Sequence, residues 1–312
     1  MISCTEFIPA YSELFTFLAQ KQGRAEVDKF WAYLFEPDGN GIPLVNFVEK
    51  EGIRGCYSYW AGSLNEEAAD FSMYVNEKRG FFTIEMHRCP SKGRLLQLQE
   101  TDGVKPFPDY CLHCDYYRYA VEKLGLKYIY NFTGMDKAAC SILIYDPKVF
   151  DGRVIIDEDT TVMHRSAGDN EYFHKDFHSS MNMGVEYLGV NYGTETVVAY
   201  LQDFTNHVYG KLIGAMESRG LAALEEKILD TYEKEKAADV VKTTLTEKEL
   251  KVEVSACPAI AHLKATGRKI SSWYGYTTTV VMQTLAEKIG AKFSMDSYDE
   301  ETGKATYRIT IQ

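Results

Sequence analysis

The segment 110–115, with the sequence Tyr-Cys-Leu-His-Cys-Asp, places two thiols, an imidazole and a carboxylate close together. We expect a helix from about Asp115 to Leu124, so Cys111 and Cys114 would lie just before its N-terminus, where the helix dipole lowers the pKa of a thiol. His113 could act as a general base or pair with a thiolate. Asp115 could orient that imidazole or cap the helix. Packing alone is the alternative interpretation of the two cysteines.

Another cysteine of the first half, Cys89, precedes a proline at the end of a predicted strand, and Cys257 does the same in the second half. Each could be a small buried residue that ends a core strand, or a nucleophile or ligand at a sheet edge. Zinc is commonly held by thiolates and imidazoles, and His87 and Cys140 lie in the same half as Cys89. A zinc site of three thiolates, with or without an imidazole, therefore stays open beside a catalytic thiol.

Two imidazoles are paired at the start of the second half, where His174 and His178 lie four residues apart. On a helix this spacing puts both side chains on one face, about one turn apart, as a divalent metal ion such as zinc requires. Asp176 lies between them and could be a ligand or a base. We predict a metal site of His174, Asp176 and His178; the alternative is two hydrogen-bonded histidines at the start of a helix.

The elements that must position these side chains occur twice in the chain. Four stretches of the first half align in order with four of the second half, at offsets of 165 to 170 residues. The matched stretches begin at Leu18 and Leu188, Leu44 and Leu212, Ile84 and Val252, and Glu122 and Glu287. Such matches in one order predict an internal duplication. We therefore predict a Cys-rich repeat at 1–150, a linker at 151–170 and a second repeat at 171–312.

Each repeat is predicted to begin with helices and to end with a small antiparallel sheet crossed by one helix, which is an α+β plan. Apolar residues at three- and four-residue spacing indicate the helices, and Gly52 and Gly220 lie where a helix would end. Alternating apolar residues indicate the strands, and we expect the strands at 127–132 and 140–145 to form a hairpin. In the linker we predict one strand, at 152–157.

The charge balance and the absence of targeting signals exclude several classes of partner. The net charge is −11 and no run of Lys or Arg offsets it, which disfavours nucleic acid and anionic membranes as partners. The sequence shows neither a basic leader nor an apolar stretch of about 18 residues that could span a bilayer. We therefore predict a cytoplasmic protein whose seven cysteines are reduced.

The cysteine pattern of the first half is similar to a known family. A strand that ends in Arg88-Cys89-Pro90, the segment 110–115, a helix that ends at Gly125 and a last strand that carries Cys140 resemble the L-2-amino-thiazoline-4-carboxylic acid hydrolase-like proteins. The resemblance implies hydrolytic opening of a small sulfur heterocycle to give N-carbamoyl-cysteine. It implies a role for Cys89, Cys111, Cys114 and Asp115. The chain departs from the family pattern in having a second copy without these thiols.

We therefore expect a hydrolase that acts on a small cyclic C–N or C–S substrate. In one version, a thiolate of Cys111 or Cys114 attacks an electrophilic carbon while His113 moves protons. In the other, water on a metal ion at the predicted histidine site attacks it. The alternative from a different class is a non-catalytic protein that binds or senses a small molecule, with a metal or redox-sensitive thiol site. The predicted partner is a small-molecule substrate, and self-association into a homo-oligomer stays open.

Overall fold

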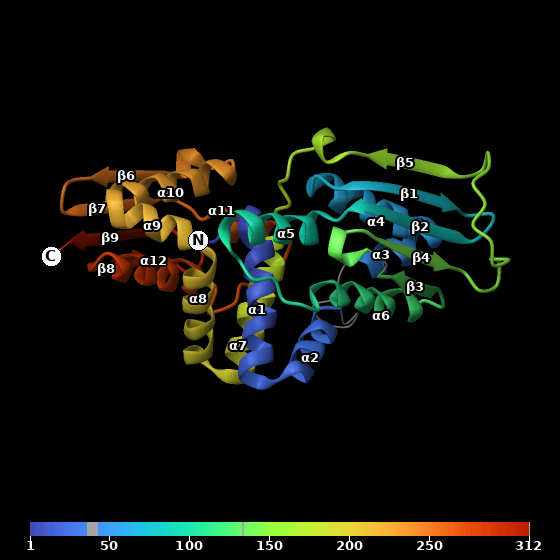
Figure 1. Cartoon of the computed structure of the whole chain (residues 1–312), viewed down its shortest axis with the longest axis horizontal. Helices are drawn as coiled ribbons and strands as arrows, with labels where there is room; N and C mark the ends of the chain where they lie inside the picture. Colours follow the sequence, from blue (N-terminus) through green and yellow to red (C-terminus); the bar gives the residue numbers. More distant parts are fainter. Residues whose placement is uncertain (36–42, 133, 312) are drawn as a thin grey trace. The chain divides into compact units, whose positions relative to one another are not determined.

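The computed structural model describes residues 1–35, 43–132 and 134–311 (Figure 1). The chain forms two compact units. The N-terminal unit contains Leu18–Gln99 and Pro106–His174, and the C-terminal unit contains Met1–Phe17, Glu100–Lys105 and Lys175–Gln312. The first residues of the chain thus pack with its second half, and the whole of the predicted linker belongs to the N-terminal unit. The predicted repeat boundaries concern sequence similarity and stay a prediction.

Helices and strands follow one another in the same order in both halves. The first half contains α1 (Phe7–Gln22), α2 (Arg24–Phe35), α3 (Leu44–Glu51), α4 (Ile53–Glu66), β1 (Asp70–Asn76), β2 (Phe81–Arg88), α5 (Pro90–Asp102), α6 (Tyr117–Glu122), β3 (Lys127–Asn131) and β4 (Cys140–Tyr145). The second half contains α7 (Phe177–Tyr192), α8 (Thr194–Val208), α9 (Gly210–Arg219), α10 (Leu221–Lys234), β6 (Val241–Leu245), β7 (Glu249–Val254), α11 (Pro258–Ala265), α12 (Tyr276–Lys288), β8 (Ala291–Tyr298) and β9 (Ala305–Ile311). A duplication would produce this shared order, and the duplication itself stays a prediction.

Each unit contains one antiparallel sheet, which confirms the α+β class. The sheet of the N-terminal unit has the order β3-β4-β2-β1-β5, where β5 is Thr161–Arg165, and the sheet of the C-terminal unit has the order β6-β7-β9-β8. The predicted hairpin of β3 and β4 is confirmed by their antiparallel pairing. Read in reverse, the second sheet has the order β8-β9-β7-β6. These strands correspond, in chain order within their half, to β3-β4-β2-β1 of the first sheet.

Two glycines end helices where the sequence predicts an end. Gly52 follows α3 at φ 60° and ψ −142°, and Gly220 follows α9 at φ 58° and ψ −136°. Both residues adopt a positive φ, which costs a residue with a Cβ atom more than it costs glycine. Each glycine also precedes a further helix, α4 or α10. α4 is a helix that the sequence patterns described above do not predict.

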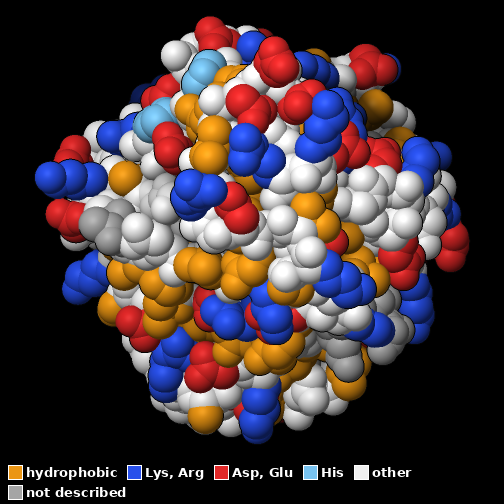
Figure 2. Space-filling view, turned by 90° about the vertical axis from the view of Figure 1, so that its right-hand side faces the viewer, with side chains coloured by type: hydrophobic (Ala, Val, Ile, Leu, Met, Phe, Trp, Pro, Cys, Tyr) orange, Lys and Arg blue, Asp and Glu red, His pale blue; other side chains and the backbone are white. Residues whose placement is uncertain are grey.

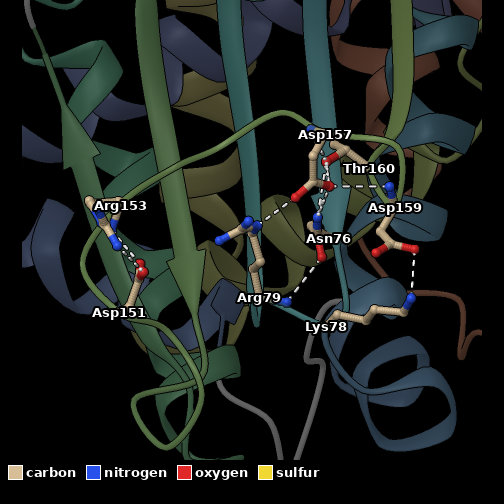
Figure 3. Close-up of polar contacts among 8 residues, drawn as sticks. All are labelled: Asn76, Lys78, Arg79, Asp151, Arg153, Asp157, Asp159 and Thr160. Atoms are coloured by element: carbon tan, nitrogen blue, oxygen red, sulfur yellow. Dashed lines mark hydrogen bonds and ion pairs between the residues drawn. The ribbon is translucent and has the colours of Figure 1, made fainter.

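The linker strand lies later in the chain than predicted. Residues 152–157 are not a strand, and β5 pairs with β1 instead. The reason is a turn that Asp157 and Thr160 form at the end of the predicted strand: the Thr160 amide donates to the Asp157 carbonyl at 3.1 Å. The Asp157 carboxylate accepts from Arg79 at 2.6 Å and from Asn76 at 2.8 Å (Figure 3). These bonds tie the linker to the turn between β1 and β2.

The core of the N-terminal unit lies where α3, α4 and α6 cover the sheet. Trp60 of α4 stacks on Phe82 of β2 with ring centroids 5.4 Å apart, and both side chains are buried. In the C-terminal unit, α10 and α12 contact the sheet, and the buried Tyr200 hydroxyl donates to the Ala10 carbonyl of α1 at 2.8 Å. None of the helices in the described residues is long and apolar enough to cross a bilayer. On the face that Figure 2 shows, Lys and Arg side chains are interspersed with Asp and Glu.

Candidate functional site

Cys89 lies at the junction between β2 and α5. Its amide donates to the Ala138 carbonyl at 2.7 Å, which ties the junction to the loop before β4. Pro90 begins α5 because a first helical position needs no amide hydrogen. The Lys92 amide, in the first turn of α5, lies 3.5 Å from the Cys89 sulfur and donates to it. The sulfur therefore lies at a helix N-terminus, which is the environment that the sequence analysis expects for Cys111 and Cys114.

A cavity of about 160 Å³ opens beside Cys89. Besides the thiol, its lining includes two acidic residues, two arginines and an aromatic side chain: Glu67, Asp70, Arg88, Arg94 and Tyr172. All of these residues belong to the N-terminal unit. The side chain of Cys89 is partly exposed, whereas that of its counterpart Cys257 is buried and lies 3.3 Å from the sulfur of Met1. Of the two Cys-Pro junctions, the one at Cys89 is the one with a partly exposed thiol.

Glu67 is one of the two acidic residues that line this cavity, beside Asp70, and it follows directly on α4. Burial raises the pKa of its carboxyl to about 7, against a lowering by nearby His174. His174 itself lies with Nδ1 2.7 Å from Oε2 of Glu66. A carboxyl that titrates near neutral pH can both accept and donate a proton, which is the property of a general acid–base group. Sequence reasoning missed Glu67 because a single Glu at a helix end carries no local signal.

The two arginines make the cavity suited to an anion. The guanidinium of Arg94 lies over the ring of Tyr172, 4.8 Å from its centroid. The Nε of Arg94 is buried and has no hydrogen-bond partner among the residues that the structure describes. Nη2 of Arg88 makes a long bond of 3.5 Å to the Gly93 carbonyl. A ligand carboxylate would satisfy such donors, because Arg binds carboxylates through paired N–H groups.

The prediction that Cys111 and Cys114 lie just before the N-terminus of a helix that begins near Asp115 is wrong. Both lie inside a 3-10 helix (Tyr110–Tyr116), and α6, which follows it, is a short helix that begins at Tyr117 rather than near Asp115. No N-terminus of a longer helix therefore faces their sulfurs from the predicted position. Burial instead raises the pKa of Cys111 to about 11 and raises that of Cys114 well above its usual value. Both thiols are protonated at neutral pH.

His113 contacts Cys114 but does not ionise it. Its Nε2 lies 3.5 Å from the Cys114 sulfur, and its Nδ1 contacts the Tyr110 carbonyl. Because a carbonyl only accepts, Nδ1 carries the proton and Nε2 accepts from the thiol. Burial lowers the pKa of His113 to about 4. The raised pKa of the thiol and the lowered pKa of the imidazole together keep the pair neutral.

Asp115 does not cap α6 in the way predicted, and its carboxylate pairs with an arginine. Its carboxylate pairs with Arg118, one turn along the chain. The N-cap of α6 is Tyr116, and no side chain bonds there. The carbonyl of Cys114 accepts from the Tyr128 hydroxyl at 2.7 Å, which fixes the segment against β3. Asp115 is thus part of a surface ion pair in the N-terminal unit.

Cys89, Cys111 and Cys140 lie near Cys114 in the N-terminal unit. Burial raises the pKa of Cys114 first, and the nearby sulfurs of Cys89, Cys140 and Cys111 raise it further. His87 is turned elsewhere, with Nε2 2.7 Å from the Ser72 hydroxyl. A zinc site of these thiolates stays a prediction. Their sulfurs do not form one of the close groups of ligand atoms that the described residues contain.

The predicted histidine site is not assembled. α7 begins at Phe177, so His174 precedes the helix and the two imidazoles do not share a helical face. Each predicted ligand has its own partner: His174 has Glu66, Asp176 has His262 at 3.4 Å, and His178 has Glu235 at 3.1 Å. His174 belongs to the N-terminal unit and His178 to the C-terminal unit.

His178 belongs to a different group of ligand atoms. Together with Cys4 and Glu235 it forms the one group of at least three metal-binding side chains, within the described ranges, whose ligand atoms all lie within 4.8 Å of one another. Sequence reasoning missed Cys4 and Glu235, which lie 231 residues apart. No local spacing pattern joins residues that lie so far apart along the chain.

Comparison with known proteins gives no relative. No protein-family model, no curated protein and no solved structure matches the chain.

Proposed function

We propose that the chain is a hydrolase that opens a small heterocycle carrying a carboxylate, and that the reaction takes place in the cavity beside Cys89. The observation that supports this proposal best is the convergence of a thiol, a carboxyl with a pKa of about 7 and two guanidinium groups on one cavity. The cavity volume of about 160 Å³ suits a single small ring. The cysteine pattern that resembles thiazoline hydrolases supports the substrate class.

In this mechanism Cys89 is the nucleophile and Glu67 moves the protons. The thiol transfers its proton to the Glu67 carboxylate as its sulfur attacks the ring carbon between nitrogen and sulfur. The ring C–S bond then breaks, and the departing ring sulfur takes the proton from Glu67. The substrate is now attached to Cys89 as an isothiourea. Activation of a thiol by an adjacent base is the usual route to such a covalent intermediate.

Water completes the reaction. A water molecule attacks the same carbon and gives a proton to Glu67, and Cys89 departs and takes that proton back. The net change is addition of one water to the substrate, which becomes an N-carbamoyl amino acid with a free thiol. Arg88 and Arg94 would hold the substrate carboxylate throughout, because cations in a partly buried site bind anions strongly.

The test is turnover of 2-amino-thiazoline-4-carboxylate by the whole chain, measured as release of a free thiol and as gain of one water by mass spectrometry. We expect Cys89→Ser to abolish turnover. Cys257→Ser is the matched control, because Cys257 occupies the same Cys-Pro junction in the other half without a partly exposed thiol, and we expect it to keep turnover. Full activity of Cys89→Ser would contradict the proposal.

One observation favours the alternative of a protein that binds or senses a small carboxylate without turnover. Burial, together with the nearby thiol of Cys140 and the carboxyl of Glu67, raises the pKa of Cys89 to about 12, so the thiol is neutral until a base removes its proton. A binding protein would show saturable binding of the same thiazoline carboxylate by calorimetry, weakened by Arg94→Gln, and no released thiol. The hydrolase shows both binding and released thiol.

A further inference from the structure

Three buried side chains of the C-terminal unit direct a sulfur, a nitrogen and a carboxylate oxygen toward one point. Cys4, His178 and Glu235 place these ligand atoms within 4.8 Å of one another. The three residues are 1%, 2% and 0% exposed. We propose that they bind a zinc ion or a similar divalent transition metal. The site is separate from the cavity beside Cys89 and does not depend on the proposed hydrolase activity.

Hydrogen bonds hold the Glu235 carboxylate in the orientation that a ligand needs. Its Oε1 accepts from the Cys4 amide at 2.6 Å and from the Ser3 hydroxyl at 2.9 Å. This leaves Oε2 directed at His178, with Nε2 at 3.1 Å. Carboxylate ligands of metal ions are normally fixed by such outer hydrogen bonds, and losing them weakens metal binding.

His178 is fixed in the same way from its other side. Its Nδ1 lies 3.1 Å from the Tyr274 hydroxyl. A hydroxyl oxygen can accept from Nδ1–H, and an imidazole with its proton on Nδ1 has a lone pair on Nε2. A metal-bound histidine usually donates its second ring N–H to an outer partner in this manner. The atom left to bind the metal is the one that faces Glu235 and Cys4.

The charges of the group match a divalent ion. A Cys4 thiolate and the Glu235 carboxylate together carry two negative charges, which a divalent cation neutralises, and the imidazole stays neutral. A thiol must lose its proton to bind a metal ion, so metal binding at this group releases protons. The buried charges of the deprotonated ligands are then compensated by the ion.

The donor types select zinc within the divalent ions. Sulfur, imidazole nitrogen and carboxylate oxygen are the three donors that zinc uses in proteins, whereas calcium and magnesium take oxygen donors. Three protein ligands leave the fourth tetrahedral position to a water molecule. The arrangement differs from the predicted histidine site in every ligand except His178.

X-ray absorption at the zinc edge of the whole chain, dialysed against zinc, tests the proposal without any substitution. We expect about one bound zinc per chain, with one sulfur at about 2.3 Å and nitrogen or oxygen ligands at about 2.0 to 2.2 Å. A first shell of three or four sulfurs would place the ion among the thiols of the N-terminal unit and overturn the proposal. Absence of bound zinc would overturn it as well.

Cobalt in place of zinc allows a test by substitution. Cobalt bound to a thiolate absorbs strongly in the near ultraviolet, and we expect this band in the wild-type chain and in Cys257→Ser. Cys257 is the matched control because it is the other buried cysteine near the start of a helix in the same unit. We expect Cys4→Ser to lose the band and to bind the ion at least about tenfold more weakly. A band that survives in Cys4→Ser overturns the proposal. If Cys4→Ser does not fold, the sulfur count from X-ray absorption of the wild-type chain decides.

Discussion

The Nε2 atom of His178 lies 3.1 Å from Oε2 of Glu235, and both side chains are buried. In the metal-free protein the two groups form a buried hydrogen-bonded pair. Removing the imidazole would leave a carboxylate buried and uncompensated. Removing one partner lowers the free energy of unfolding by more than the pair itself contributes. The reason is that the desolvation cost of the remaining charge is no longer offset.

We predict that His178→Ala lowers the free energy of unfolding by about 3 to 5 kcal/mol in the presence of a chelator. His207→Ala is the matched control. His207 pairs with Glu13 at 2.9 Å, but its own side chain is 55% exposed. We expect this control to lose at most about 1 kcal/mol. Urea unfolding of both variants measures the difference, and equal losses would contradict the assignment of a buried hydrogen-bonded pair.

Glu67 predicts a pH dependence of stability in the N-terminal unit. The pKa of its carboxyl is about 7 in the folded chain against a usual value of 4.5, chiefly through burial. A raised pKa means that the protonated form is favoured by folding. The stabilising contribution is therefore fully present below pH 4.5 and is lost as the pH rises through 7.

Glu67→Gln should remove this dependence, because Gln resembles the protonated carboxyl and does not titrate. From pH 5 to pH 8 we expect the wild-type chain to lose up to about 3 kcal/mol more than Glu67→Gln. Urea unfolding at the two pH values measures this, with Glu66→Gln as the control at the exposed neighbouring position. An equal pH response of the wild type and Glu67→Gln would show that Glu67 has its ordinary pKa.

We predict that a side chain at Gly189 in α7 destabilises the fold. A Cβ atom there would lie 2.3 Å from the ring of Trp273, and the Trp273 Nε1 is bonded to Thr194 at 2.9 Å, which holds the ring in place. We expect Gly189→Ala to lower the free energy of unfolding by about 1 to 3 kcal/mol through overpacking. Gly214→Ala in α9 meets no atom within 4 Å and should raise stability by about 0.5 to 1 kcal/mol. Thermal unfolding of the two variants should shift in opposite directions.

The hydrogen bonds of Asp157 hold the linker against the turn between β1 and β2. We predict that loss of these bonds lets β5 open more often. Asp157 bonds to Arg79 and Asn76, and its side chain is 28% exposed. We expect Asp157→Ala to increase amide hydrogen exchange in 161–165, because β5 is no longer tied to the turn between β1 and β2. Asp159→Ala is the control: its bond to Lys78 at 2.7 Å joins two largely exposed side chains, and such pairs contribute at most about 1 kcal/mol. Equal exchange in both variants would contradict this role for Asp157.

The sequence predicted those features that local patterns determine. Alternating apolar residues located β2 and β7, and Gly52 and Gly220 located the ends of α3 and α9 because the backbone there needs a positive φ. The linker strand was misplaced because the residues 152–157 are apolar enough for a strand. Side-chain bonds of Asp157 and Thr160 make a turn where that strand would end.

The candidate sites were predicted less well, since they depend on contacts between distant residues. Cys89 was found from its position before a proline. The acid beside it, Glu67, comes from a helix end, and its pKa depends on burial that no local pattern reveals. The prediction that a helix dipole lowers the pKa of Cys111 and Cys114 was wrong because a 3-10 helix lies where the start of an α-helix was expected.

The pairing of β5 with β1 affects how the sheets meet other chains. With β5 in place, β1 is an interior strand of its sheet, whereas its counterpart β6 is an end strand. An end strand presents unpaired amide and carbonyl groups to which another chain can add. Lys242 interrupts β6 with a charge, a feature that discourages such addition. If β5 separated from the sheet, β1 would become an end strand, and its side chains are more apolar than those of β6. We therefore expect release of the linker to promote aggregation through β1.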